Sequence, residues 1–210
     1  RPGIWTHFAQ TRTSGVVKAW INGVGSANTV TDTTSWATSR FGSEHNSSSE
    51  NFEGDMADIR ITHSAIYSSD FTPPTAPLTA ITNTKFLLNP ETSISDLSQK
   101  SEIQCFGDAA TSTTQVKFAG TKSIYLDGTG DYLQISNVED SWISGYTGDF
   151  TVEFWWYPTN VSNGTYQEIF TAGSGFQLYI SPAGGLSLVL SSTNASPWFV
   201  DFWEEYKPTL

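Results

Sequence analysis

The sequence predicts an all-β protein that folds as a two-sheet antiparallel sandwich, and its central segment carries the clearest signal. Residues 150–156 (FTVEFWW) place an apolar side chain at every second position, with Thr151 and Glu153 on the opposite side. This alternation is typical of a strand that buries one face. Residues 122–136 alternate in the same way on either side of a Gly-rich turn at 127–131, which predicts a hairpin.

The composition also favours an all-β fold. Of the 210 residues, 15% are charged and 14% are aromatic, Ser, Thr and Gly are abundant, and no long amphipathic helical run is present. This length suits one large sandwich or two small domains, and it can bury a core without disulfides. Cys105 is the single cysteine, so no internal disulfide is possible, and its strand-like setting predicts a buried thiol.

The formal net charge of −11 restricts the partners that this chain can bind. Nucleic-acid phosphates and anionic membranes both require clustered Lys and Arg, which the chain lacks. No apolar run approaches about 18 residues, so no membrane insertion is expected. The acidic excess favours solubility, with cation binding as the other use.

The remaining strands can be placed from alternation and turn residues. In residues 52–61 the alternation puts Ala57, Ile59 and Ile61 on one side. Residues 25–50 fit either a long loop or a pair of short strands, and the tail at 198–210 receives no assignment. The other predicted strands are 4–10, 16–22, 84–89, 102–106, 166–172, 175–181 and 186–192.

A Pro-rich segment at 72–78 predicts an extended connector, because proline cannot donate to a β ladder. It is the candidate module boundary, and it divides the chain into residues 1–78 and 79–210.

Several segments resemble the laminin G-like, concanavalin A-like lectin/glucanase jelly-roll family, in particular the repeat-bearing type of bacteriophage and marine viral structural proteins. Residues 84–89 and 117–135 look like the opening strands of that family, and 148–157 look like its central strand. Residues 5–23 and 52–75 look like its closing strands.

The order of these segments departs from the family, because the closing strands precede the opening strands. Either the chain spans parts of two repeats, or residues 79–210 and 1–78 complete one circularly permuted sandwich. The second alternative is favoured for an isolated chain, because half a jelly roll would expose open edges and an apolar face.

The resemblance implies a non-enzymatic structural or adhesion module on an extracellular or virion surface. Its expected partners are neighbouring protein subunits in an assembly and a cell-surface glycan. A purely structural scaffold without ligand remains an alternative. The other alternative is a glycan hydrolase of the jelly-roll glucanase type using Glu53, Asp55 and Asp58. Such glucanases carry Glu-x-Asp-x-x-Glu on one strand, and here Asp58 is one methylene shorter.

Four aromatic side chains are candidates for carbohydrate binding, because they alternate away from the inward apolar set. Exposed aromatic faces can stack against sugar rings, although they can equally pack under loops or against a neighbouring subunit. His7 is expected to be a core histidine. The four candidates are Trp20, Trp155, Tyr157 and Tyr179.

Acidic turn residues are the remaining candidates for chemistry. Asp127, Asp131 and Asp149 lie at turns near the central strands, and Ca²⁺ prefers carboxylate and carbonyl oxygens. Aspartates in such turns more often cap the backbone, and no calcium loop of fixed spacing is present. We therefore assign no catalytic residue, no metal ligand and no cofactor, with Ca²⁺ at these aspartates as the alternative.

Overall fold

Fifteen strands and no helix make up the computed structural model, which describes residues 2–35, 39–46, 49–91, 93–136, 146–161, 163–173 and 175–190. The strands form two antiparallel sheets, so the predicted all-β, two-sheet antiparallel architecture is confirmed. Among these residues, no helix has the length and apolarity needed to cross a membrane.

The larger sheet, called sheet A, holds nine strands in the order β3-β2-β1-β12-β6-β10-β9, with β4 beside β2 and β7 beside β6. Its strands are β1 (Thr6–Thr13), β2 (Val16–Ile21), β3 (Val24–Gly25), β4 (Val30–Thr31), β6 (Glu53–Thr62), β7 (Thr84–Leu88), β9 (Ala110–Ser112), β10 (Ser123–Asp127) and β12 (Phe150–Pro158).

The smaller sheet, called sheet B, holds six strands in the order β15-β14-β13-β5-β11-β8. Its strands are β5 (Ser39–Phe41), β8 (Glu102–Phe106), β11 (Tyr132–Ser136), β13 (Gln167–Ala172), β14 (Phe176–Ile180) and β15 (Leu186–Leu190). The ambiguous segment at 25–50 therefore contains the short strands β4 and β5 rather than one long loop.

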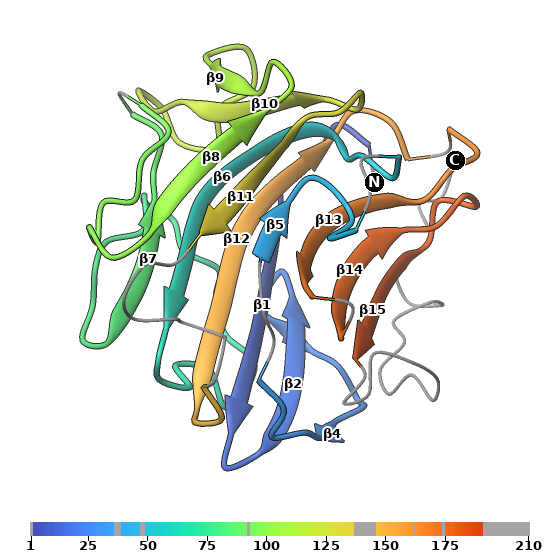
Figure 1. The fold of residues 1–210 in the computed structure, drawn as a ribbon. Helices are drawn as coiled ribbons and strands as arrows, with labels where there is room; N and C mark the ends of the chain where they lie inside the picture. The colour runs from blue at the N-terminus through green and yellow to red at the C-terminus, as the bar shows by residue number, and fades with distance from the viewer. Residues whose placement is uncertain are drawn as a thin grey trace.

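Both sheets combine strands from before and after the Pro-rich connector. Figure 1 shows β12 in orange between β1 in blue and β6 in teal, and both pairings are antiparallel. In sheet B, β5 lies between β11 and β13. Residues before and after the Pro-rich connector therefore complete one another's sheets within a single sandwich.

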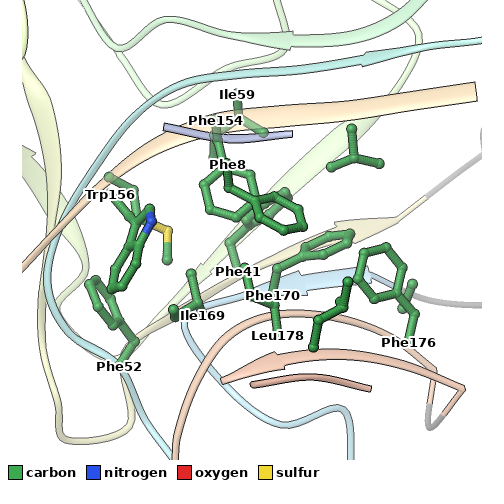
Figure 2. Packing of buried hydrophobic residues seen from close by; sticks show 14 of the residues in the cluster. Phe8, Phe41, Phe52, Ile59, Phe154, Trp156, Ile169, Phe170, Phe176 and Leu178 are labelled. Carbon is green, nitrogen blue, oxygen red and sulfur yellow. The ribbon is translucent and has the colours of Figure 1, made fainter. Parts of the chain in front are cut away.

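The core lies between the two sheets and is dominated by phenylalanine. Phe8 and Phe154 from sheet A face Phe41 and Phe170 from sheet B, with Phe176 at one side (Figure 2). The ring centroids of Phe41 and Phe170 are 4.5 Å apart, and those of Phe8 and Phe154 are 5.2 Å apart. Aromatic pairs at such distances add about 0.5–1.5 kcal/mol each beyond the area they bury.

A buried arginine, which the pattern of apolar residues does not mark, closes one end of this core. The Arg12 guanidinium donates to the carbonyl oxygens of Gly148 (2.9 Å), Thr34 (2.7 Å) and Tyr146 (3.0 Å). It also lies 4.8 Å from the ring centroid of Phe150. These bonds hold the segment before β12 and the segment after β4 against the end of β1.

The position of Cys105 differs from the prediction. The thiol is exposed, because Cys105 lies on β8, which among the described residues is the last strand of sheet B. A terminal strand has one side without a neighbour, and the strand-like pattern alone could not show that.

Candidate functional site

The connector between β6 and β7 lies on the outer face of sheet A. Within residues 63–83, the rings of Tyr67 and Phe71 stack at 3.6 Å, and each contacts Trp20 with centroids 6.3 Å apart. The Phe71 amide donates to the Gly23 carbonyl at 2.9 Å. The connector therefore covers this part of the face, and Trp20 is only 1% exposed.

A charged cluster is enclosed beneath the connector and centres on Glu153. Arg60 donates to its Oε1 through Nε at 2.9 Å and Nη2 at 2.5 Å, and the Tyr67 hydroxyl donates to its Oε2 at 2.7 Å. His7 Nε2 lies 3.4 Å from the same Oε2. Burial would raise the pKa of Glu153, but His7, Arg60 and Tyr67 together lower it.

His7 was expected on the inward face, and the structure places it on the outer face of sheet A. It pairs in register with Trp155, while its neighbour Phe8 pairs with Phe154 in the core. His7 is buried because Phe71 of the connector packs edge-on to its ring at 5.8 Å. It contacts the charged cluster rather than the core.

An irregularity in β6 changes which side chains share a face. The register between β6 and β12 shifts between Glu153 and Trp155, and Asp58 has a φ of 50°. As a result Ala57 pairs with Trp155 on the outer face, whereas Ile59 and Ile61 point into the core. The prediction that Ala57 shares the face of the two isoleucines is therefore wrong, because the extra residue of a β-bulge reverses the alternation.

The three carboxylates of the hydrolase alternative lie in different environments. Asp58 is 1% exposed, accepts a hydrogen bond from the Leu78 amide at 2.9 Å, and has its pKa raised to about 6, mainly by burial. Asp55 is 2% exposed and accepts from the Ser123 hydroxyl at 2.7 Å, and burial raises its pKa as well. Glu53 is half-buried.

A row of aromatic side chains crosses the part of this face that the connector leaves open. Tyr157 and Tyr125 both pair in register with Asp55, one from each neighbouring strand. Trp5 extends the row, with its ring 5.5 Å from Tyr157. Tyr125 is 42% exposed, and Trp5 and Tyr157 are half-buried. With strands about 4.8 Å apart, the row spans roughly 14 Å.

The surroundings of this row are acidic. The pKa of the Tyr125 phenol is raised by partial burial and by the negative charges of Asp127, Glu53, Asp55 and Asp131. Such a field disfavours an anionic ligand at the exposed end of the row.

The structure separates the four aromatics predicted to bind carbohydrate. Trp20 and Trp155 are 1% and 4% exposed, so the expectation that they are exposed is wrong, because the connector and Lys117 cover them. Tyr157 belongs to the aromatic row. Tyr179 lies on β14 of sheet B, where its ring meets that of Tyr166 edge-on at 5.4 Å. The four residues therefore do not form one platform.

The acidic turn residues are also only partly brought together. Asp127 and Asp131 meet Asp108, with carboxylate oxygens within 4.8 Å of one another. Asp131 already accepts from the amides of Asp108 (2.8 Å) and Asp127 (2.9 Å). Asp149 lies apart and accepts from the Ser14 amide at 2.7 Å. These contacts are backbone caps of the kind that aspartates make in turns.

Comparison with known proteins adds no assignment, because no family model, no curated protein and no solved structure matches the chain.

Proposed function

We propose that this chain is a non-enzymatic adhesion module of the laminin G-like, concanavalin A-like jelly-roll type, displayed on an extracellular or virion surface. The proposal joins the resemblance of the strand motifs to the two-sheet antiparallel architecture. The pairing of strands from residues 1–78 with strands from residues 79–210 in both sheets supports the circularly permuted arrangement of these two segments.

The ligand that we propose is a glycan, bound along the row of Trp5, Tyr157 and Tyr125. The observation that carries this proposal is the alignment of three partly exposed aromatic rings on one face of sheet A, with Asp55 of β6 between Tyr157 and Tyr125. Aromatic faces offer apolar contact to the C–H groups of sugar rings, and nearby carboxylates accept hydrogen bonds from sugar hydroxyls. The acidic surroundings favour neutral or amino sugars over sialylated or sulfated ones.

A glycan array with the purified chain tests this proposal, followed by titration of any bound oligosaccharide. Tyr125→Ala should weaken binding roughly tenfold, which corresponds to about 1.4 kcal/mol, and Tyr125→Phe should retain most of it. Tyr166→Ala is the matched control, because Tyr166 is 43% exposed and lies beside Tyr179 of sheet B.

The variants distinguish the two aromatic surfaces. Loss of binding in Tyr166→Ala with Tyr125→Ala unchanged would move the site to sheet B. If the wild-type chain binds none of the neutral, amino and acidic glycans on a broad array, glycan binding is refuted. The alternative that then stands is a scaffold without ligand.

Binding to a neighbouring subunit is the second candidate, and the exposed strand β8 favours it. Among the described residues β8 pairs only with β11, and three of its five residues are exposed. A terminal strand with open backbone groups can pair with a strand of another chain. Light scattering over a concentration series tests this, and replacing the exposed Gln104 by Pro should reduce self-association.

We do not extend the proposal to hydrolysis. A retaining glycosidase needs two carboxylates about 5 Å apart that both reach the substrate, and Asp58 is enclosed by the connector through the Leu78 amide.

A further inference from the structure

Two carboxylates lie side by side next to the exposed end of the aromatic row. In the antiparallel pairing of β10 with β6, Asp127 is the register partner of Glu53, and Tyr125 is the partner of Asp55. Side chains directly opposite each other in such a pair have Cβ atoms about 4.5–5.5 Å apart. The turn after Asp127 is equally close to Glu53, because a Cβ added to Gly128 would lie 3.1 Å from the Glu53 Cβ.

Both carboxylates share the outer face of sheet A with the aromatic row. On β10, the core residue Leu126 separates Tyr125 from Asp127, so these two side chains point outward. On β6, the core residue Met56 lies three positions after Glu53, which therefore points outward as well. Asp127 is exposed and Glu53 is half-buried. The Tyr125 ring and the two carboxylates thus border the same area of open surface.

The described part of the chain supplies no cation to this pair of carboxylates. Glu53 Oε1 accepts from the Thr159 hydroxyl at 3.2 Å, and Asp127 Oδ1 accepts from the Thr129 amide at 2.6 Å. Neither carboxylate forms an ion pair with a described residue. Like charges directly opposite each other destabilise an antiparallel pair. A positively charged ligand would relieve that repulsion.

We propose that the glycan bound along the aromatic row is an amino glycan, with a protonated amine held between Glu53 and Asp127 beside the ring of Tyr125. This inference rests on the proposed glycan site and names the class of sugar that the site takes. One ammonium group can donate to both carboxylates at their spacing, in charge-assisted hydrogen bonds. The face of the phenol ring attracts the same cation, because the ring is electrostatically negative there.

An amino sugar fits this arrangement better than the lysine of a peptide does. A glucosamine unit carries its amine on a pyranose ring, whose C–H groups can pack against an aromatic face. Beyond Tyr125 the row offers two further rings, Tyr157 and Trp5, to the neighbouring sugars of the same glycan. A lysine side chain brings the charge without a ring to stack. An N-acetylated sugar brings the ring without the charge, so the repulsion between the carboxylates remains.

Calorimetric titration with a glucosamine tetramer and with its N-acetylated counterpart tests the inference. The pH is chosen to keep the free amines protonated, and EDTA keeps divalent metal ions away from the carboxylates. We expect the wild type to bind the glucosamine tetramer about fivefold more tightly at low salt, as two exposed charged contacts would give. The preference should shrink as NaCl is added, because salt screens exposed charges.

Two variants locate the amine. Asp127→Asn and Glu53→Gln each remove one charge and keep an oxygen that can accept the bond from Thr129 or Thr159. Both should bring the ratio of the two tetramer affinities closer to one. Glu102→Gln is the matched control, because it removes the same charge from an exposed position on β8 of sheet B, and it should keep the wild-type ratio.

The outcomes separate this inference from the glycan site itself. Equal affinity of the wild type for the two tetramers would overturn the amino-glycan assignment and leave a site for neutral glycans. A preference that Glu102→Gln reduces as much as Asp127→Asn and Glu53→Gln do would also overturn it, because the effect would then come from net charge alone. An oligolysine peptide of equal charge that binds as tightly as the glucosamine tetramer would assign the site to a cationic peptide instead. Failure of the wild type to bind any glycan would refute the proposed function as well.

Discussion

Asp58 provides a quantitative test of how the connector is held to sheet A. Its carboxylate is 1% exposed, and its pKa is raised from 3.8 to about 6, chiefly by burial and further by the negative charges of Glu91 and Glu153. The Leu78 amide, which donates to Oδ1 at 2.9 Å, acts in the opposite direction. We consider Asp58→Asn, which keeps an oxygen acceptor for Leu78 and removes the charge.

The sign of the effect follows from proton linkage. Because the folded pKa of Asp58 lies above the unfolded one, the folded state holds the extra proton between pH 3.8 and about 6. Stability is therefore lost as the pH rises through this window, and the loss is complete above it. At 1.36 kcal/mol per pH unit, the penalty is about 1 kcal/mol at pH 4.5 and about 3 kcal/mol at pH 7.5.

Asp58→Asn removes this penalty, and asparagine also tolerates the φ of 50° at this position. Burial of the amide N–H groups carries a cost that does not depend on pH. The diagnostic quantity is therefore the difference in free energy of unfolding between variant and wild type, which should grow in favour of the variant by about 2 kcal/mol from pH 4.5 to pH 7.5.

Urea unfolding at several pH values measures this difference. Asp70→Asn is the control, because Asp70 lies on the same connector, is exposed, and accepts from the Gly25 amide at 2.9 Å in a bond that asparagine keeps. A difference for Asp58→Asn that stays constant over this pH range, or that grows in favour of the wild type, would refute the reasoning.

Three further substitutions test the enclosed parts of the fold, by urea unfolding for Glu153→Gln, by proteolysis for Gly23→Ala and by thermal unfolding for Arg12→Lys. Glu153→Gln should cost about 3–5 kcal/mol of stability at pH 7, because its cationic partner Arg60 is left unpaired. The cost should be smaller below pH 4.5, where the stabilisation that the ionised carboxylate gives the folded wild type is progressively lost. An effect that is the same at pH 7 and pH 4 would contradict this. Gly23→Ala places a Cβ 1.8 Å from the Phe71 carbonyl and should loosen the connector, which proteolysis detects, whereas Gly120→Ala, with a similar φ and nothing within 4 Å, is the control. Equal proteolysis of the two glycine variants would contradict the close approach. Arg12→Lys should cost about 2–4 kcal/mol, because one ammonium cannot serve three carbonyls in the guanidinium geometry; a Tm unchanged from wild type would show that these bonds contribute little.

Local alternation predicted the strands well, because each strand buries one face against the same core. The segment predicted at 150–156 became β12, and the segment at 122–136 became the strands β10 and β11. The hairpin predicted there is wrong, because β10 pairs with β6 and β9 in sheet A, whereas β11 pairs with β5 and β8 in sheet B. Alternation around a tight turn does not show whether the chain crosses from one sheet to the other. The bulge at Asp58 was missed, because a single residue in the left-handed region leaves no mark in a pattern of apolar residues.

The candidate site was harder to predict, because exposure depends on contacts between distant segments. Trp20 and Trp155 do point away from the core, yet the connector and Lys117 cover them. Trp5 and Tyr125 belong to the aromatic row because strand pairing across β12 and β6 brings them near Tyr157, and the sequence pattern does not show that pairing.

The pairing of β1 with β12 has a consequence for synthesis of the chain on the ribosome. Thr6–Thr13 leaves the ribosome some 140 residues before its partner Phe150–Pro158, and β6 waits for the same strand. Long-range pairing of this kind slows folding, because a long loop must close before its contacts form. Until then the apolar faces of the early strands stay open to water, so chaperone binding during translation should be strongest before residue 150 has left the exit tunnel.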